Sequence, residues 1–122
     1  MTLRVSLEES AHAPGGTVRG RVLVLESADA RSLNVALRFW EKSPDYSHCA
    51  IEVPGPSFGP EAITAGLEHA FALVLPDGAM PGFESPHGRL FWEVDVWLDR
   101  FGSDHHERVE FHVVPGVGRR GG

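Results

Sequence analysis

The stretch GRLFWEVDVWLD, residues 88–99, shows which class of fold this chain forms. Every second residue in it is apolar, and these residues are Leu90, Trp92, Val94, Val96 and Leu98. Side chains of a β-strand point to opposite faces in turn, so this period of two predicts a strand with one buried face. The residues of the other phase share the opposite face: Phe91, Glu93, Asp95 and Trp97.

The same period of two recurs along the chain. It is clear in LRVSL (3–7), TVRGRVLVLE (17–26) and SLNVALRFW (32–40), and shorter runs around residues 49–53, 71–75 and 109–113 also have it. The best helical candidate, Pro60–Leu67, is short and contains Gly66, which disfavours a helix. About seven strands without intervening helices favour an all-β fold, an immunoglobulin-like antiparallel β-sandwich.

Turn residues separate these runs. Pro14–Gly16 ends the first connection, and the segment Lys42–Asp45 predicts a tight hairpin. The chain has 122 residues, enough for one domain with a real core. We expect one sandwich domain over residues 1–115 and a flexible C-terminal tail over residues 116–122.

Composition limits the classes of partner. The formal net charge is −6, which argues against nucleic acid and anionic membranes, because these partners usually need a basic patch. The single cysteine, Cys49, excludes an intramolecular disulfide. We see neither a signal peptide nor an apolar run long enough to span a membrane. We therefore expect a soluble, cytoplasmic protein, and the bias of ten arginines against one lysine indicates a bacterial genome.

A more specific pattern joins these strands. The segments HAPGGTVRGRVLV (12–24), DARSLNVALRFWEK (29–42), GLEHAFALVLPDGAMPGFESPHGRLFWEVDVWLD (66–99) and FHVV (111–114) follow one another in this order. This order resembles the arrestin-like β-sandwich family, which includes arrestins, Vps26-type retromer subunits and Spo0M-type sporulation-control proteins. The resemblance implies an adaptor or scaffold rather than an enzyme. Most members carry two such sandwiches, and we expect a single-domain form here.

Two carboxylates in the opening stretch raise the alternative of an active site. Glu93 and Asp95 lie two residues apart on one strand face, about 6.5 to 7 Å from each other, which suits paired acid and base work. Because the apolar residues take the inner face, we expect both carboxylates on a solvated outer face with near-normal pKa values. The prediction is therefore no catalytic residue.

Large aromatic residues share that outer face. Phe91 and Trp97 are in phase with the carboxylates, and Trp40 has the outward phase of its own strand, beside Arg38. Exposed aromatic patches mark interfaces or ligand platforms, so the predicted contact surface comprises Arg38, Trp40, Phe91, Glu93, Asp95 and Trp97. Arg38 could form a cross-strand ion pair with either Glu93 or Asp95, because the sequence does not give the strand register. Alternatively, the loops 54–60 and 76–86 fold over the rings.

Other chemistry finds little support. His105 and His106 are adjacent and would point apart on an extended chain, so we expect no metal; a site, if present, would join one of them to Asp104. Cys49 alternates with Ile51 and Val53 and is expected to be a small buried residue. The chain lacks a nucleophile elbow, a P-loop and a dinucleotide-binding glycine motif. We expect no cofactor.

The leading prediction is a non-enzymatic protein-interaction module whose partner is another protein or a second copy of the chain, as in a homodimer. Self-association through strand edges or through the aromatic outer face is expected. The alternative is a sandwich that binds a carbohydrate or small molecule on Trp40 and Trp97. A third possibility, an enzyme that uses Glu93 and Asp95, requires a pocket with converging polar groups.

Overall fold

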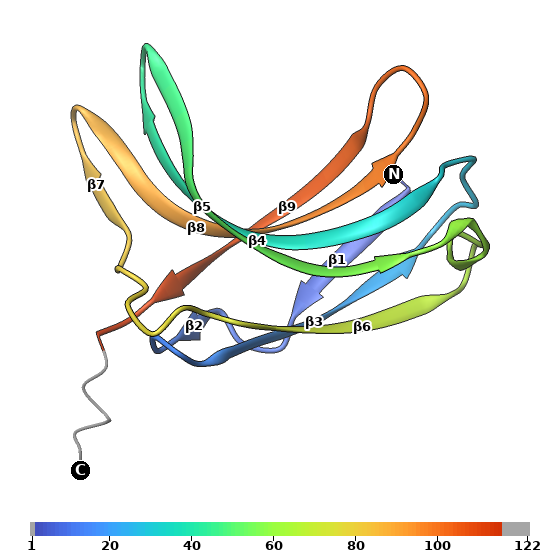
Figure 1. The fold of residues 1–122 in the computed structure, drawn as a ribbon, viewed down its shortest axis with the longest axis horizontal. Helices are drawn as coiled ribbons and strands as arrows, with labels where there is room; N and C mark the ends of the chain where they lie inside the picture. Colours follow the sequence, from blue (N-terminus) through green and yellow to red (C-terminus); the bar gives the residue numbers. More distant parts are fainter. Residues whose placement is uncertain (1, 116–122) are drawn as a thin grey trace.

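Two β-sheets pack face to face in the computed structural model, which describes residues 2–115 (Figure 1). The small sheet has the order β1 (Leu3–Leu7), β3 (Thr17–Val24), β6 (Glu68–Val74). The large sheet has the order β2 (Ala11–His12), β9 (His105–Val113), β8 (Gly88–Asp99), β4 (Ser32–Ser43), β5 (Tyr46–Phe58), and β7 (Phe83–Ser85) also pairs with β8. All pairs are antiparallel except the short β2–β9 pair. The predicted antiparallel sandwich is confirmed.

Two of the predicted boundaries differ from the structure. The helical candidate Pro60–Leu67 forms a 3₁₀ helix only over Pro60–Ala62, and the proline-rich segment expected as a loop from residue 54 continues β5 to Phe58. The predicted hairpin is confirmed, because β4 ends at Ser43 and β5 begins at Tyr46. The expected tail, residues 116–122, lies outside the described residues. No helix within residues 2–115 has the length and apolar character needed to cross a membrane.

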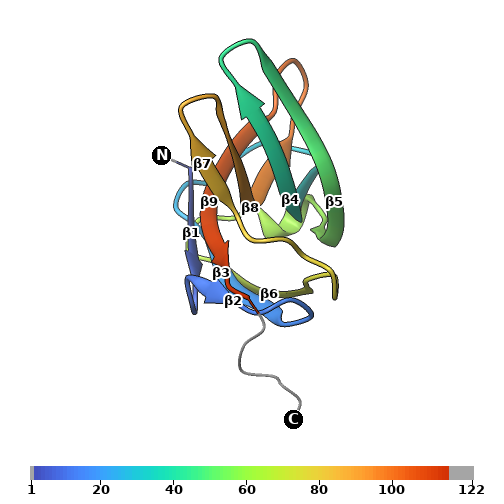
Figure 2. The ribbon, with the colours of Figure 1, turned by 90° about the vertical axis from the view of Figure 1, so that its left-hand side faces the viewer.

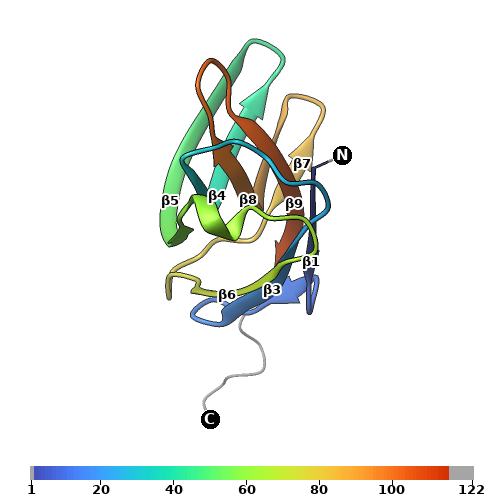
Figure 3. The ribbon, with the colours of Figure 1, turned by 90° about the vertical axis from the view of Figure 1, so that its right-hand side faces the viewer.

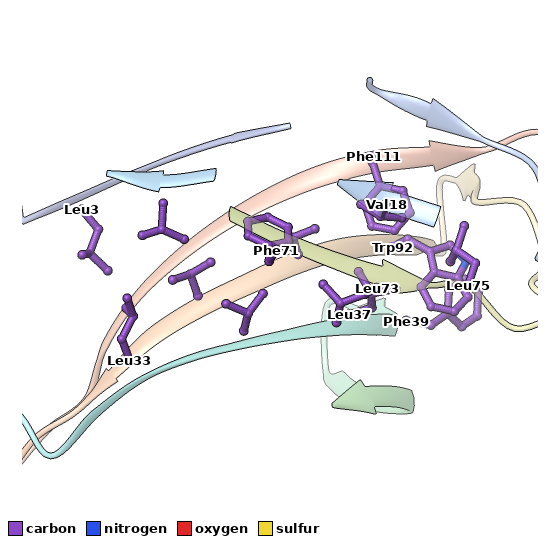
Figure 4. Packing of buried hydrophobic residues seen from close by; sticks show 14 of the residues in the cluster. Leu3, Val18, Leu33, Leu37, Phe39, Phe71, Leu73, Leu75, Trp92 and Phe111 are labelled. Atoms are coloured by element: carbon purple, nitrogen blue, oxygen red, sulfur yellow. The ribbon is translucent and has the colours of Figure 1, made fainter. Parts of the chain in front are cut away.

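The core lies between the two sheets (Figure 4). The apolar phase of β8 is buried as predicted, and Trp92 is its largest member. The Trp92 ring lies 4.9 Å from that of Phe39 and 6.2 Å from that of Phe111. Its indole N–H donates to the carbonyl of Met80 at 2.8 Å, so this core residue also fixes the connection between β6 and β7.

Gly20 in β3 allows the core to close at the small sheet. It is buried opposite Phe71 of β6 and Leu7 of β1. A Cβ atom at this position would lie 2.4 Å from the carbonyl oxygen of Ser6 and 2.6 Å from Cζ of Phe71. The missing side chain at Gly20 therefore makes room for the ring of Phe71.

The large sheet is curved and extends beyond the small one. β4 and β8 rise at both ends, away from β1, β3 and β6, so the outer face of these two strands is concave (Figure 1). The β4–β5 and β7–β8 hairpins stand side by side, away from the small sheet (Figure 2). Seen from the opposite side, β5 forms the margin of the large sheet (Figure 3).

A β-bulge in β5 changes which side chains share a face. Ile51 pairs with Phe39 and Cys49 pairs with Trp40, so Ala50 is an extra residue on β5. Because one extra residue reverses the alternation, Cys49 falls in the outward phase with Trp40 and is half-buried. The prediction that Cys49 is buried in phase with Ile51 is wrong for this reason.

Candidate functional site

The concave outer face of the large sheet holds the predicted contact residues on two neighbouring strands. β4 carries Arg38 and Trp40, and β8 carries the other four. The register pairs Trp40 with Phe91 and Arg38 with Glu93. The structure therefore brings the six predicted residues together on one face, as the phase of the two strands indicated. Their role as an interaction surface remains a prediction.

The two carboxylates are buried rather than solvated. Asp95 is 0% exposed and Glu93 is 4% exposed. The prediction of a solvated outer face with normal carboxylates is wrong, because the neighbouring strands send long side chains across the concave surface. Both carboxylates have partners for their polar atoms, as buried charges require.

Asp95 is held by groups from both neighbouring strands. Arg38 of β4 donates Nη1–H to Asp95 Oδ2. On β9, His106 Nδ1 lies 2.9 Å from Asp95 Oδ1 and Arg108 Nε lies 3.5 Å from Oδ2. Arg38 also donates to Glu52 of β5 at 3.0 Å. The predicted ion pair of Arg38 therefore forms diagonally with Asp95, and a row of charges crosses four strands.

Glu93 has fewer charged partners than Asp95. The indole N–H of Trp40 donates to Glu93 Oε2 at 2.7 Å, and Arg108 Nε lies 3.6 Å from the same oxygen. Burial raises the pKa of Glu93 above its ordinary value, and the hydrogen bond from Trp40 offsets part of that increase. Glu93 therefore titrates at a higher pH than a solvated glutamate.

Cationic side chains cover the aromatic rings on this face. The Arg38 guanidinium lies 4.8 Å from the centroid of the Trp97 ring, and His106 stacks on that ring at 5.8 Å. At the other end, Arg89 lies 4.3 Å from the Phe91 centroid. Lys42 lies 5.2 Å from the Trp40 centroid. A ligand that stacks on these rings would have to displace a cation or an imidazole.

Sequence reasoning missed the residues that cover the carboxylates. His106 and Arg108 lie in β9, which begins at His105, whereas the alternation in the sequence placed this strand around residues 109–113. The register places Arg108 opposite Asp95 and His106 opposite Trp97. The one sign of this arrangement in the sequence is that His106 and Arg108 are two residues apart, as Asp95 and Trp97 are. That signal is readable only once the strand pairing is known.

The histidines and carboxylates of this face already have partners within the domain. The histidines proposed for a metal are used separately: His105 Nε2 lies 3.1 Å from Glu107 Oε2, and His106 contacts Asp95. Asp104 instead accepts the backbone N–H of Arg100. Within residues 2–115, no group of three histidine, cysteine, aspartate or glutamate side chains could hold a metal ion. The carboxylates are already neutralised, which makes the face an ordered surface of paired charges and aromatic rings.

Pockets lie beside this face rather than over the carboxylates. One of about 250 Å³ lies between Trp97 and the Pro54–Pro56 segment of β5. Two others, of about 270 and 310 Å³, lie at the projecting hairpins and share Phe83, Arg89 and Leu90. Neither Glu93 nor Asp95 lines any of these three pockets, so none of the three is the pocket that an active site built on these two carboxylates would need.

Comparison with known proteins identifies the fold. No family model matches the sequence, and no curated protein matches it. Among solved structures, the chain is similar to the crystal structure of Spo0M, a sporulation control protein from Bacillus subtilis, with a TM-score of 0.60 and 22% sequence identity. The match covers 92% of this chain and 48% of that chain, so this chain spans about half the length of its neighbour. The fold is an arrestin-like β-sandwich, as predicted.

Proposed function

We propose that this domain is a non-enzymatic protein-interaction module of arrestin-like type, which acts as a scaffold or adaptor in the bacterial cytoplasm and also self-associates. The concave outer face of the large sheet is the observation that carries the proposal. Its charged groups are paired with one another, and Arg108, whose side chain is 49% exposed, and half-buried Trp97 remain accessible at its surface. Aromatic and arginine side chains of this kind dominate the energetics of protein interfaces.

The geometry also supports a binding role over catalysis. Asp95 already has Arg38, His106 and Arg108 as partners, and Glu93 has Trp40. An acid or base needs a proton-transfer path to a substrate, and these two carboxylates instead order the side chains around them. The similarity to a sporulation control protein agrees with a regulatory role for the fold.

The test is affinity capture with the immobilised domain and its variant Trp97→Ala. Val74→Ala is the matched control, because Val74 is 60% exposed and lies on the small sheet. We expect wild-type protein and the control to retain the same partner. Trp97→Ala should bind this partner with about tenfold lower affinity, a typical cost for an aromatic interface residue. Unchanged melting temperatures would show that all three are folded.

Two outcomes would contradict the proposal. Equal capture by wild-type protein and Trp97→Ala would remove the concave face from the interaction. Saturable quenching of tryptophan fluorescence by a glycan or small molecule, without any captured protein, would favour the alternative of a ligand-binding sandwich. The pocket between Trp97 and Pro54–Pro56 is the place where such a ligand would bind.

A further inference from the structure

β5 offers an open edge to a further strand. It is the last strand of the large sheet and pairs only with β4 within residues 2–115 (Figures 2 and 3). Pro54 and Pro56 interrupt its second half and have no N–H to donate. The first half, Tyr46–Val53, is free of proline. An unpaired edge of eight residues can accept a strand from another chain.

The bulge at Ala50 makes this edge complementary to itself. When two copies of a strand pair antiparallel about a two-fold axis, the two residues opposite each other must point to the same face of the joined sheet. In a regular strand, this holds only when the residue numbers of the two opposite residues add up to an even number. The extra residue Ala50 changes that sum to an odd one across the bulge. In β5, the inward phase then holds Tyr46, His48, Ile51 and Val53, and the outward phase holds Ser47, Cys49 and Glu52.

Apart from the pair that contains the bulge residue Ala50, two registers place opposite side chains on a common face. A two-fold axis between Ala50 and Ile51 would bring Pro54 opposite Ser47 of the second copy. An axis between Cys49 and Ala50 keeps the ladder within the proline-free half. It sets Tyr46 opposite Val53 of the second copy and Ser47 opposite its Glu52. Tyr46 is 55% exposed in the single chain and would be covered by this pairing.

Charge favours the second register. Lys42 pairs with Ser47 across β4 and β5, and Arg38 pairs with Glu52. Four residues would therefore lie side by side on four adjacent strands of the joined sheets: Lys42 and Ser47 of one copy, then Glu52 and Arg38 of the second copy. Lys42 and that Glu52 would stand two strands apart, about 10 Å between Cα atoms, with only the small Ser47 between them. Lys42 has no carboxylate within 4.0 Å among residues 2–115, so the second copy would supply one.

The β6 edge of the small sheet lacks this complementarity. On β6, a two-fold pair centred on Phe71 would set Ala70 opposite Ala72 of the second copy. These alanines pair with Arg21 and Arg19 of β3. The row across the joined sheets would then have an arginine on each side of two alanines, which brings like charges towards each other.

We infer that two copies of this chain pair antiparallel along Tyr46–Val53, with the two-fold axis between Cys49 and Ala50, and so join their large sheets into one. This inference rests on the proposed interaction role and names one partner, a second copy. The chain carries its own probe, because Cys49 is its only cysteine. In this register the two Cys49 Cα atoms lie about 6 Å apart, whereas in the other register they lie about 11 Å apart.

The experiment combines light scattering over a concentration series with thiol crosslinking by a short bismaleimide. We expect a concentration-dependent dimer that crosslinks through Cys49. Ser47→Glu should weaken the dimer by about tenfold, because it faces Glu52 of the second copy twice in each dimer. Ala72→Glu is the matched control, since it puts the same charge on the edge of the small sheet. Cys49→Ser should abolish the crosslink but keep the dimer.

The outcomes separate this inference from the proposed function. A strict monomer, a dimer without the Cys49 crosslink, or a dimer that Ala72→Glu breaks and Ser47→Glu does not, would overturn the inference. Capture of a partner by a monomeric protein through Trp97 would then leave the interaction role intact. Conversely, a Cys49-linked dimer that captures no other protein would support the inference and limit the function to self-association.

Discussion

The two faces of β8 are both buried, and they are buried by different means. On the inner face, Trp92, Val94 and Val96 are covered by the small sheet. On the outer face, Glu93 and Asp95 have no second layer above them. Their cover comes from side chains of β4 and β9 that reach across a concave surface.

Curvature of the large sheet replaces a covering layer on the outer face. Side chains on a concave face converge, so arginine, histidine and tryptophan from adjacent strands meet over the middle one. The inner face gains stability from apolar surface removed from water. The outer face must offset the cost of desolvating two carboxylates with ion pairs and hydrogen bonds, so it adds order more than it adds stability.

Loss of Trp92 on the inner face should destabilise the domain most. Trp92→Ala should lower the free energy of unfolding by about 3–5 kcal/mol, because it leaves a cavity beside Phe39 and Phe111 and frees the carbonyl of Met80. Urea unfolding followed by circular dichroism measures this loss. A loss below about 1 kcal/mol would show that the core closes around the missing ring.

A smaller effect is expected from breaking the outer face. Asp95→Ala should cost about 2–3 kcal/mol, because Arg38 loses its buried partner and His106 loses its acceptor. Arg21→Ala is the control, since its ion pair with Glu68 is exposed on both sides and should be worth at most about 0.5 kcal/mol. If the two variants unfold at the same urea concentration, the outer network contributes no more than a surface pair.

The smallest effect is a change in pH dependence at Glu93. Burial raises the pKa of Glu93 in the folded state, so the folded protein binds more protons than the unfolded chain between the two pKa values. Stability should therefore fall as the pH rises through this window, above the ordinary glutamate pKa, and level off beyond it. Glu93→Gln keeps an acceptor for Trp40 and should remove this fall. Unfolding of both proteins from pH 4.5 to 8 measures the difference, and parallel curves would contradict it.

The sequence was sufficient for the position of most long strands and for the phases of β4 and β8. Alternation in residues 88–99 correctly separated the inner row from the row of Phe91, Glu93, Asp95 and Trp97, since the period of a strand is local. The turn at Lys42–Asp45 was also predicted correctly because its signal lies within four residues. The fold followed from the order of such local signals.

The environment of the carboxylates could not be predicted, because it depends on strand pairing. Arg108 lies opposite Asp95 across β8 and β9, and nothing in the segment His105–Arg108 indicates that pairing. The phase of Cys49 failed for a related reason. A bulge adds one residue to a strand, and Ala50 carries no residue signal that would mark it as the extra one.

Burial on both faces also has a dynamic consequence for β8. Its backbone is paired with β4 on one edge and with β9 and β7 on the other, so we expect its amides to exchange with solvent only when the whole domain unfolds. β5 has one paired edge, and its side chains are half-buried or exposed. We therefore expect amides on the free edge of β5 to exchange with solvent faster than those of β8. Hydrogen exchange should then be slowest at the centre of the large sheet and faster at its β5 edge.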